Sequence, residues 1–261
     1  MPVGEVVDAG VVLDELYVDA ETWADAADGA PLRAAVEAAA AAGTPVWSLP
    51  PGVLARVSAT VTPQGLLAVA PRRTVGLGDV CLAPGPVVVL VDVADPGNLG
   101  TLVRAAEAAG AAGIVVAGSG TDPFGPKAVR AAAGSLLRLA VAEVGDAAAA
   151  VRAIAAAGRR VVATVATGGE APEDVDLSGP IAVLVGSEAH GLPAEVVAAS
   201  ATRVTIPIAA TVESLNAAVA GAVVLFEAAR QRRLTAPRAA AAAPVGTDWT
   251  TEPSTDRLGD R

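Results

Sequence analysis

The stretch Val204–Arg233, VTIPIAATVESLNAAVAGAVVLFEAARQRR, decides the fold. It opens as a short β-rich run that ends at Pro207, because proline has no amide proton for a strand ladder. Ser214, Leu215 and Asn216 then begin a run of small and apolar residues without proline, which predicts a long buried helix. A strand, an irregular loop and a buried helix form a unit that commonly presents backbone amides and carbonyls to a ligand. The plain alternative is the last βα unit of an open sheet.

Two more polar stretches directly follow apolar runs. Asp95–Arg104 reads DPGNLGTLVR, and Gly186–Leu192 reads GSEAHGL. Together with IP…ESLN in the first stretch, they resemble the three signature motifs of the SpoU (TrmH-like) ribose 2′-O-methyltransferases of the SPOUT superfamily. Three matches in the right order, each at a strand end, form a specific signal.

The second part of the chain alternates regularly between apolar runs and helical runs. Near-continuous apolar strands predict a parallel sheet that is covered on both faces. The strands are expected at PVVVLVDV, GIVVAG, LAVAEV, RVVATVA, IAVLVG and RVTIPI, with helices after Asn98, Lys127, Asp146, Pro193 and Ser214. The resemblance implies that this domain is a SPOUT-type methyltransferase domain with a trefoil knot, and that it dimerises through its first and last helices.

The first 70 residues or so predict a small α/β domain with the element order β-α-β-α-β. This part resembles the ribosomal-protein-like substrate-recognition module of the same family. Family members usually carry a further helix and strand before the point where this chain begins, so the small domain is expected to be incomplete at its N-terminus. The expected organisation is an RNA-binding domain over 1–72, a Gly- and Pro-rich linker over 73–84, the methyltransferase domain over 85–234 and a disordered tail over 235–261.

Composition bounds the functional class. A hydrophobic content of 53% is ample for a core, no apolar run reaches membrane length and no signal peptide is seen, so a soluble cytoplasmic protein is expected. The net charge of −10 counts against a generic polyanion binder, although residues 1–80 hold four Arg against ten Asp and Glu and so carry most of the excess. One cysteine, Cys81, and one histidine, His190, are too few for a disulfide or a zinc site, and no metal is expected.

Five residues are candidates for catalysis. A ribose 2′-hydroxyl is a weak nucleophile, so methyl transfer from S-adenosylmethionine needs the hydroxyl held in line and its proton removed. Taken alone, Asn98 is expected as a helix N-cap and Arg104 as an exposed helix arginine. The resemblance implies that both belong to the active site, with Arg104 as general base or as the group that fixes the 2′-oxygen and adjacent phosphate. We favour positioning, because a guanidinium keeps its proton at neutral pH. The resemblance adds Glu188, which can orient Arg104 or Asn216, and places Ser214 and Asn216 on the target hydroxyl.

The resemblance also implies where S-adenosylmethionine binds. Glycines allow the backbone to approach a ligand closely, and the loop after IAVLVG is expected against the cofactor. The loop after RVVATVA is expected on its other side. The cofactor-binding residues are expected to be Thr164, Ala166, Gly168, Gly186, Gly191, Ile206 and Leu215. His190 is expected to be a bystander, since family members vary at that position.

Other classes of function predict other patterns. An NAD-linked dehydrogenase would carry G-x-G-x-x-G after an early strand, and DPGNLGTLVR lacks that spacing. A serine hydrolase would need G-x-S-x-G, which GSEAHGL does not supply. A non-catalytic RNA-binding or ribosome-assembly protein of the same fold remains open, as does a tRNA substrate. We favour 2′-O-methylation of 23S ribosomal RNA, because the small domain is ribosomal-protein-like and the C-terminal tail is poor in basic residues.

Overall fold

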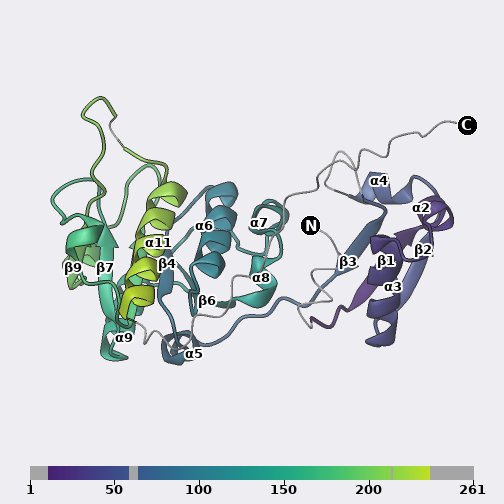
Figure 1. Ribbon diagram of the computed structural model, residues 1–261, viewed down its shortest axis with the longest axis horizontal. Coiled ribbons are helices and arrows are strands. Elements are labelled where there is room, and N and C mark those ends of the chain that lie inside the picture. The colour runs from purple at the N-terminus through teal and green to yellow at the C-terminus, as the bar shows by residue number, and fades with distance from the viewer. Residues whose placement is uncertain (1–10, 59–63, 213, 236–261) are drawn as a thin grey trace, which may run out of the picture.

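The computed structural model describes residues 11–58, 64–212 and 214–235. Within these ranges the chain forms a small sheet of three strands and a larger sheet of six, which lie side by side in Figure 1. The small sheet has the order β2-β1-β3, with β1 parallel to β2 and antiparallel to β3. Its elements are β1 (Glu15–Asp19), α2 (Ala20–Asp25), α3 (Pro31–Ala41), β2 (Val46–Leu49), α4 (Val53–Val57) and β3 (Leu66–Val69).

The larger sheet is entirely parallel and has the order β6-β5-β4-β8-β7-β9. The parallel α/β sheet predicted from the apolar runs is therefore confirmed. Its strands are β4 (Val87–Val91), β5 (Gly113–Ala117), β6 (Ala140–Val144), β7 (Arg160–Thr164), β8 (Ile181–Val185) and β9 (Thr202–Val204). Its helices are α5 (Leu77–Leu82), α6 (Pro96–Ala108), α7 (Pro126–Ala132), α8 (Ser135–Arg138), α9 (Ala147–Ala156), the short η1 (Pro172–Asp174), α10 (Ala194–Ala198) and α11 (Ala217–Thr235).

Helices cover both faces of the larger sheet. Side chains alternate along each strand, so the strands other than β9 contribute residues to both apolar cores, whereas β9 contributes Val204 to one of them. On one face the core is completed by α6, α7, α8 and α11, and on the other by α5, α9 and α10. Figure 1 shows α6 between α11 and α7 on the first face.

Two helix starts differ from the sequence-based expectation. Asn98 was expected to be an N-cap, but α6 begins at Pro96 and its N-cap is Asp95, whose Oδ1 accepts from the Asn98 amide at 2.7 Å. Proline suits the first helical position because it lacks the amide that would be unsatisfied there. The last helix was expected from Ser214, but α11 begins at Ala217. Asn216 precedes it, and its Oδ1 accepts from the amides of Ala218 and Val219. Asn98 is therefore not needed as a cap, whereas Asn216 acts as one.

The segment expected as a linker over 73–84 is helical in its second half. Helix α5 places Val80 and Cys81 in the core of the larger domain. Burial raises the pKa of the Cys81 thiol, which keeps it protonated. Arg159 is only 5% exposed and holds the end of α5 in place by donating to the carbonyls of Cys81, Ala83 and Gly85. Carbonyls at a helix C-terminus have no partner within the helix, so Arg159 satisfies groups that would otherwise be buried and unbonded.

Arg159→Met should destabilise the protein by roughly 2 kcal/mol or more, because it leaves several buried carbonyls without a donor. The measurement is the free energy of unfolding in urea. Arg160→Met is the matched control, since Arg160 makes only a long ion pair of 3.9 Å with an exposed Asp176. An equal and small effect of the two substitutions would show that Arg159 does not fix α5.

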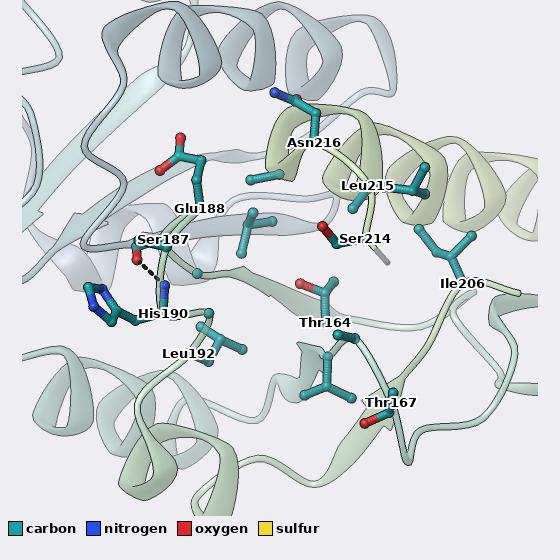
Figure 2. A pocket seen from close by; sticks show the side chains of 18 of the residues that line it. Thr164, Thr167, Ser187, Glu188, His190, Leu192, Ile206, Ser214, Leu215 and Asn216 are labelled. Carbon is teal, nitrogen blue, oxygen red and sulfur yellow. Dashed lines mark hydrogen bonds between the residues drawn. The ribbon is translucent and has the colours of Figure 1, made fainter. Parts of the chain in front are cut away.

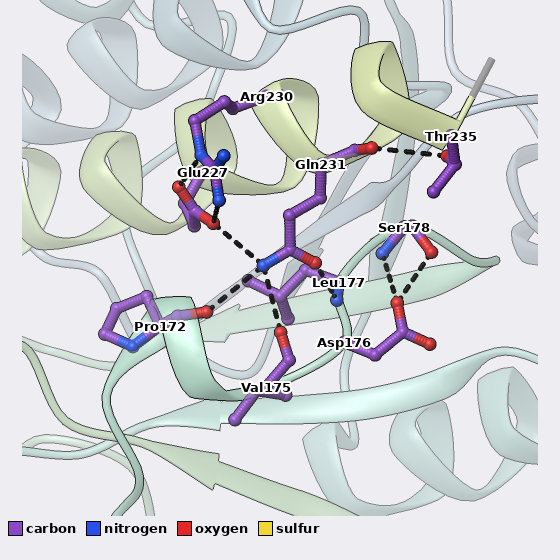
Figure 3. Close-up of polar contacts among 9 residues, drawn as sticks. All are labelled: Pro172, Val175, Asp176, Leu177, Ser178, Glu227, Arg230, Gln231 and Thr235. Carbon is purple, nitrogen blue, oxygen red and sulfur yellow. Dashed lines mark hydrogen bonds and ion pairs between the residues drawn. The ribbon is translucent and has the colours of Figure 1, made fainter.

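A partly buried set of polar contacts around Gln231 fixes α11 (Figure 3). The Gln231 Oε1 accepts from the Leu177 amide at 2.6 Å, and its Nε2 donates to the Val175 carbonyl at 3.0 Å and to Glu227 at 2.8 Å. These bonds attach α11 to the connection between β7 and β8. The trefoil knot stays a prediction, and the expected tail lies outside the described residues from 236 onward.

Candidate active site

A cleft of about 650 Å³ lies at the carboxyl ends of β7 and β8. Three chain segments form it, namely the loop after β7, the loop after β8 and the segment between β9 and α11 (Figure 2). Carboxyl ends of parallel strands are where open α/β sheets commonly bind ligands. Among the described residues, the cleft is lined by Thr164 to Thr167, Val185 to Leu192, Val204, Ile206, Ile208, Ser214 to Ala217 and Ala220.

The loop after β8 is held tightly closed. The Ser187 amide donates to the Gly191 carbonyl at 3.1 Å, and the Gly191 amide donates back to the Ser187 carbonyl at 2.8 Å. Gly186 is buried beneath this closure, and a Cβ there would lie 2.3 Å from the carbonyl carbon of Gly191. Gly191 has a φ of +67°, in the left-handed region that glycine adopts without strain. Both glycines of this motif are therefore required by backbone geometry.

A hydrogen-bonded chain of three side chains joins the motifs beside the cleft. The Asn216 Nδ2 donates to the Asn98 Oδ1 at 2.9 Å, and the Asn98 Nδ2 donates to the Glu188 Oε1 at 2.7 Å. The Asn216 Oδ1 accepts from backbone amides at the start of α11, so the Asn216 Nδ2 is the atom that faces Asn98. The side-chain amides of Asn216 and Asn98 therefore each have one consistent orientation. Residues far apart in sequence thus present one oriented carboxylate, Glu188, at the wall of the cleft.

The structure brings most of the predicted site residues together. All of them line the cleft except Asn98, Arg104 and Gly168, and Asn98 is linked to it through Glu188 and Asn216. Whether these residues act on a substrate stays a prediction. Gly168 is exposed, and its neighbour Gly169 makes the close approach, since a Cβ there would lie 2.8 Å from the Thr205 amide nitrogen.

Arg104 points away from the cleft of its own chain. Six residues separate it from Asn98, so the two side chains lie about 120° apart around α6. Asn98 faces α11, and Arg104 is exposed on the outer surface of the helix. Arg104 makes no hydrogen bond or ion pair with any other described residue. Its guanidinium is therefore available to a partner from outside the chain.

Several lining residues were not singled out from the sequence. Leu192 and Val185 add apolar wall, while Thr167 and Ser187 add hydroxyls. His190, expected to be a bystander, also lines the cleft, and its backbone amide donates to the Ser187 Oγ at 3.1 Å. Val185, Ser187, His190 and Leu192 lie in or beside the motif GSEAHGL, and Thr167 lies in the loop after β7, so position in or next to a segment expected at the site was the only available signal. Their role in the wall depends on how the loops close.

The lining of the cleft contains few charged groups. Within the described ranges, no group of His, Cys, Asp and Glu side chains could hold a metal ion. Glu188 is the one carboxylate among the lining residues that are described, and the wall otherwise consists of backbone, hydroxyl and apolar groups together with the imidazole of His190 and the side-chain amide of Asn216. Nor does any helix in the described part of the chain have the length and apolar character needed to cross a membrane. Fold and site together define an α/β domain with a ligand cleft at the carboxyl ends of a parallel sheet.

Comparison with known proteins places this domain in a family. The model of the SpoU rRNA Methylase family matches residues 85–226. An uncharacterized tRNA/rRNA methyltransferase of Mycobacterium ulcerans is 37% identical over 238 residues, which cover 89% of this chain and 76% of that protein. The chain belongs to the SpoU methylase family, as the three motifs predicted.

Solved structures agree with this membership. The AdoMet-bound rRNA methyltransferase of Sinorhizobium meliloti has a TM-score of 0.76 and 32% identity, and the match covers 87% of this chain and 84% of that one. A structure described as an RNA 2′-O ribose methyltransferase has a TM-score of 0.69 and 28% identity, with 88% and 85% covered. The SPOUT-type fold class predicted for the larger domain is confirmed.

Proposed function

We propose that this protein methylates a ribose 2′-hydroxyl of RNA, with S-adenosylmethionine as the methyl donor. The observation that carries the proposal is the hydrogen-bonded chain of side chains Asn216–Asn98–Glu188 at the edge of a glycine-bounded cleft. It joins all three motifs of the family at one place. Similarity to an AdoMet-bound methyltransferase and to an RNA 2′-O ribose methyltransferase supports the cofactor and the reaction.

The cleft suits S-adenosylmethionine. An adenosine and a methionine chain require apolar wall, close backbone groups and hydroxyls, which the loops around Gly186, Thr164 and Ile206 provide. The carboxylate of Glu188 suits a positively charged ligand. When bound, S-adenosylmethionine supplies an electrophilic methyl group on a sulfonium. The remaining requirement is a correctly held hydroxyl.

The chain's own residues are arranged to hold that hydroxyl. Ser214 and Asn216 lie at the N-terminus of α11, where the exposed side chain of Ser214 and the amide of Asn216 adjoin the cleft. Asn98 and Glu188 keep Asn216 in one orientation. Arg104 points away from this cleft, so its positive charge acts on the 2′-oxygen and neighbouring phosphate at the site of a second copy of the chain. Such positioning converts a weak nucleophile into a competent one.

Methylation of a base through a cysteine adduct does not suit this chain. Cys81 is the only cysteine in the sequence. It is buried in the core on the face of the sheet opposite α6 and α11, with a raised pKa. The thiolate that such chemistry requires is therefore neither formed nor near the cleft.

The protein acts as a homodimer through α11 and α6. Helix α11 is apolar from Ala217 to Phe226 and packs against α6 and β8 on its inner side, yet Val219, Val223 and Phe226 are 49%, 41% and 47% exposed. Their spacing of four and three residues forms one stripe. A second copy of the chain covers this stripe and brings its own outer face of α6, with Arg104, toward the interface.

Calorimetry with S-adenosylmethionine and light scattering test the cofactor and the dimer. We expect one cofactor per chain and a dimer, and we expect Phe226→Asp to give a monomer because it buries a charge in the interface. Leu82→Asp is the control, since Leu82 is 84% exposed on α5. If the protein without substitutions is a monomer and binds no S-adenosylmethionine at millimolar concentration, both the expected dimer and the expected cofactor are contradicted.

The favoured substrate is 23S ribosomal RNA. The basis is the ribosomal-protein-like small domain, for which the described residues form a compact α/β unit with its own core around Leu16 and Val36. The negative net charge means that recognition relies on RNA shape and on a few arginines. Incubation of ribosomal RNA and tRNA that lack the modification with labelled cofactor distinguishes the two substrates. Labelled tRNA alone would overturn the choice.

A further inference from the structure

Two exposed cations on α7 have no partner among the described residues. Lys127 and Arg130 are exposed and make no hydrogen bond or ion pair with another described residue. Acidic groups in this region are already engaged, because Arg72 binds Asp122 and Glu143 and a separate arginine binds Glu107. In a chain with a net charge of −10, this leaves a local excess of positive charge.

Helix α7 lies directly beside the helix that carries Asn98. A Cβ at Gly100 of α6 would lie 2.4 Å from the Ala131 Cβ and 2.8 Å from the Ala128 carbonyl oxygen. Lys127 and Arg130 adjoin these two contact residues in sequence. Arg104 is four residues after Gly100 and so lies on the same side of α6. The three exposed cations are therefore carried by two helices that pack against each other.

Helix α7 lies on the side of the larger domain that meets the small domain. Leu137 of α8, which follows α7, packs against the core of the small sheet. Arg72, just after β3, stacks on Phe124 at 4.8 Å and pairs with Asp122, both in the loop that leads into α7. Figure 1 shows α11, α6, α7 and the small domain in this order. In this view (Figure 1) α7 lies between the small domain and the helices α6 and α11.

We propose that Lys127 and Arg130 bind phosphates of the substrate RNA between the target nucleotide and the part held by the small domain. The proposal rests on the proposed function, and it names residues outside the three motifs. Lysine and arginine without internal partners bind phosphate without first breaking an ion pair, and arginine does so in a bidentate way. Such contacts set register and affinity but read no sequence.

Lys127 is the only lysine in the sequence, so an amine-selective reagent reports on one side chain and the N-terminal amine. We expect an unmodified 23S ribosomal RNA transcript to slow acylation of Lys127 several-fold, as read by peptide mass spectrometry. S-adenosylmethionine alone should leave the rate unchanged, because Lys127 does not line the cleft. Equal reactivity of Lys127 in a sample that binds and methylates the RNA would overturn the inference and leave the proposed function standing.

The salt dependence of RNA binding supplies the second measurement. Each lost phosphate contact lowers the slope of log K against log salt by about 0.7 on single strands and about 0.9 on duplex. The double substitution Lys127→Gln and Arg130→Gln should therefore lower the slope by roughly 1.4 to 1.8. Arg152→Gln is the control, because Arg152 is an exposed and unpartnered cation on α9, on the opposite face of the sheet. An unchanged slope in the double variant contradicts the proposal, and failure of the unsubstituted protein to methylate any RNA overturns the proposed function and this inference with it.

Discussion

Arg104→Ala is expected to lower turnover by roughly 10²-fold or more, the usual scale for a positioned acid–base group. The affinity for S-adenosylmethionine should stay unchanged, because Arg104 does not line the cleft. Folding should also be unaffected, since Arg104 is exposed and has no partner among the described residues, and alanine suits a helix. The separation of kcat from cofactor binding is what identifies Arg104 as a group that acts on the substrate.

Single-turnover kinetics with saturating RNA measure the effect on the chemical step. Arg152→Ala is the matched control, an exposed helix arginine on the other face of the sheet. If Arg104→Ala turned over at the rate of the control, Arg104 would be an ordinary surface residue. Arg104→Lys is informative too, because a lysine keeps the charge but not the planar fork, and a partial rescue would indicate charge as the main contribution.

Gly186→Ala is expected to abolish tight cofactor binding and to reduce kcat/KM by roughly 10²-fold or more, since a misplacement of about 1 Å can cost that much. The new Cβ would lie 2.3 Å from the carbonyl carbon and 2.4 Å from the carbonyl oxygen of Gly191. These are backbone atoms held by the two hydrogen bonds between Ser187 and Gly191. The loop must open to admit the methyl group, and Glu188 moves with it.

Gly179→Ala is the control for this substitution. Gly179 precedes the same strand β8 at its other end, and a Cβ there would meet nothing within 4 Å. Calorimetry with S-adenosylmethionine compares the two variants, with the unfolding transition as a check on folding. Normal cofactor affinity in a folded Gly186→Ala would show that the closed loop is not part of the cofactor site.

The fold of the larger domain could be predicted because its sequence signals are local and repeated. Runs such as that of β4 have five buried residues in a row, which indicates a strand covered on both faces. The order of the strands could not be predicted from periodicity, because each strand resembles the next. Family resemblance, and not composition, supplied the expectation of a SPOUT-type arrangement.

Helix boundaries show where local reasoning fails. Both Asp95 and Asn98 are good capping residues, and the proline between them decides in favour of Asp95. The position of the cap decides how alanine substitutions of Asn98 and Asn216 are interpreted. Asn98→Ala does not remove a helix cap, so a loss of activity there reports on the contacts of Asn98 with Glu188 and Asn216. Asn216→Ala does remove a cap, and its activity must be corrected for a stability loss of about 1 kcal/mol.

The candidate site was predictable only as far as the motifs extend. Glu188 and Asn216 could be named from their motifs, but their connection through Asn98 depends on where α6 and α11 pack. Val185 and Thr167 line the cleft because neighbouring loops close over them, and no residue type reveals that. The outward direction of Arg104 follows from helical periodicity once Asn98 is placed, yet the sequence does not fix that placement.

The most direct test of the proposed function compares ribosomal RNA and tRNA from cells with and without this gene. A blocked 2′-oxygen cannot attack the adjacent phosphate, so a methylated ribose gives a linkage that resists alkaline cleavage. We predict a protected linkage in 23S ribosomal RNA only when the gene is present, together with a 2′-O-methyl nucleoside in the digest. A gene-dependent methyl group on a base, with no protected linkage in either RNA, would contradict the account.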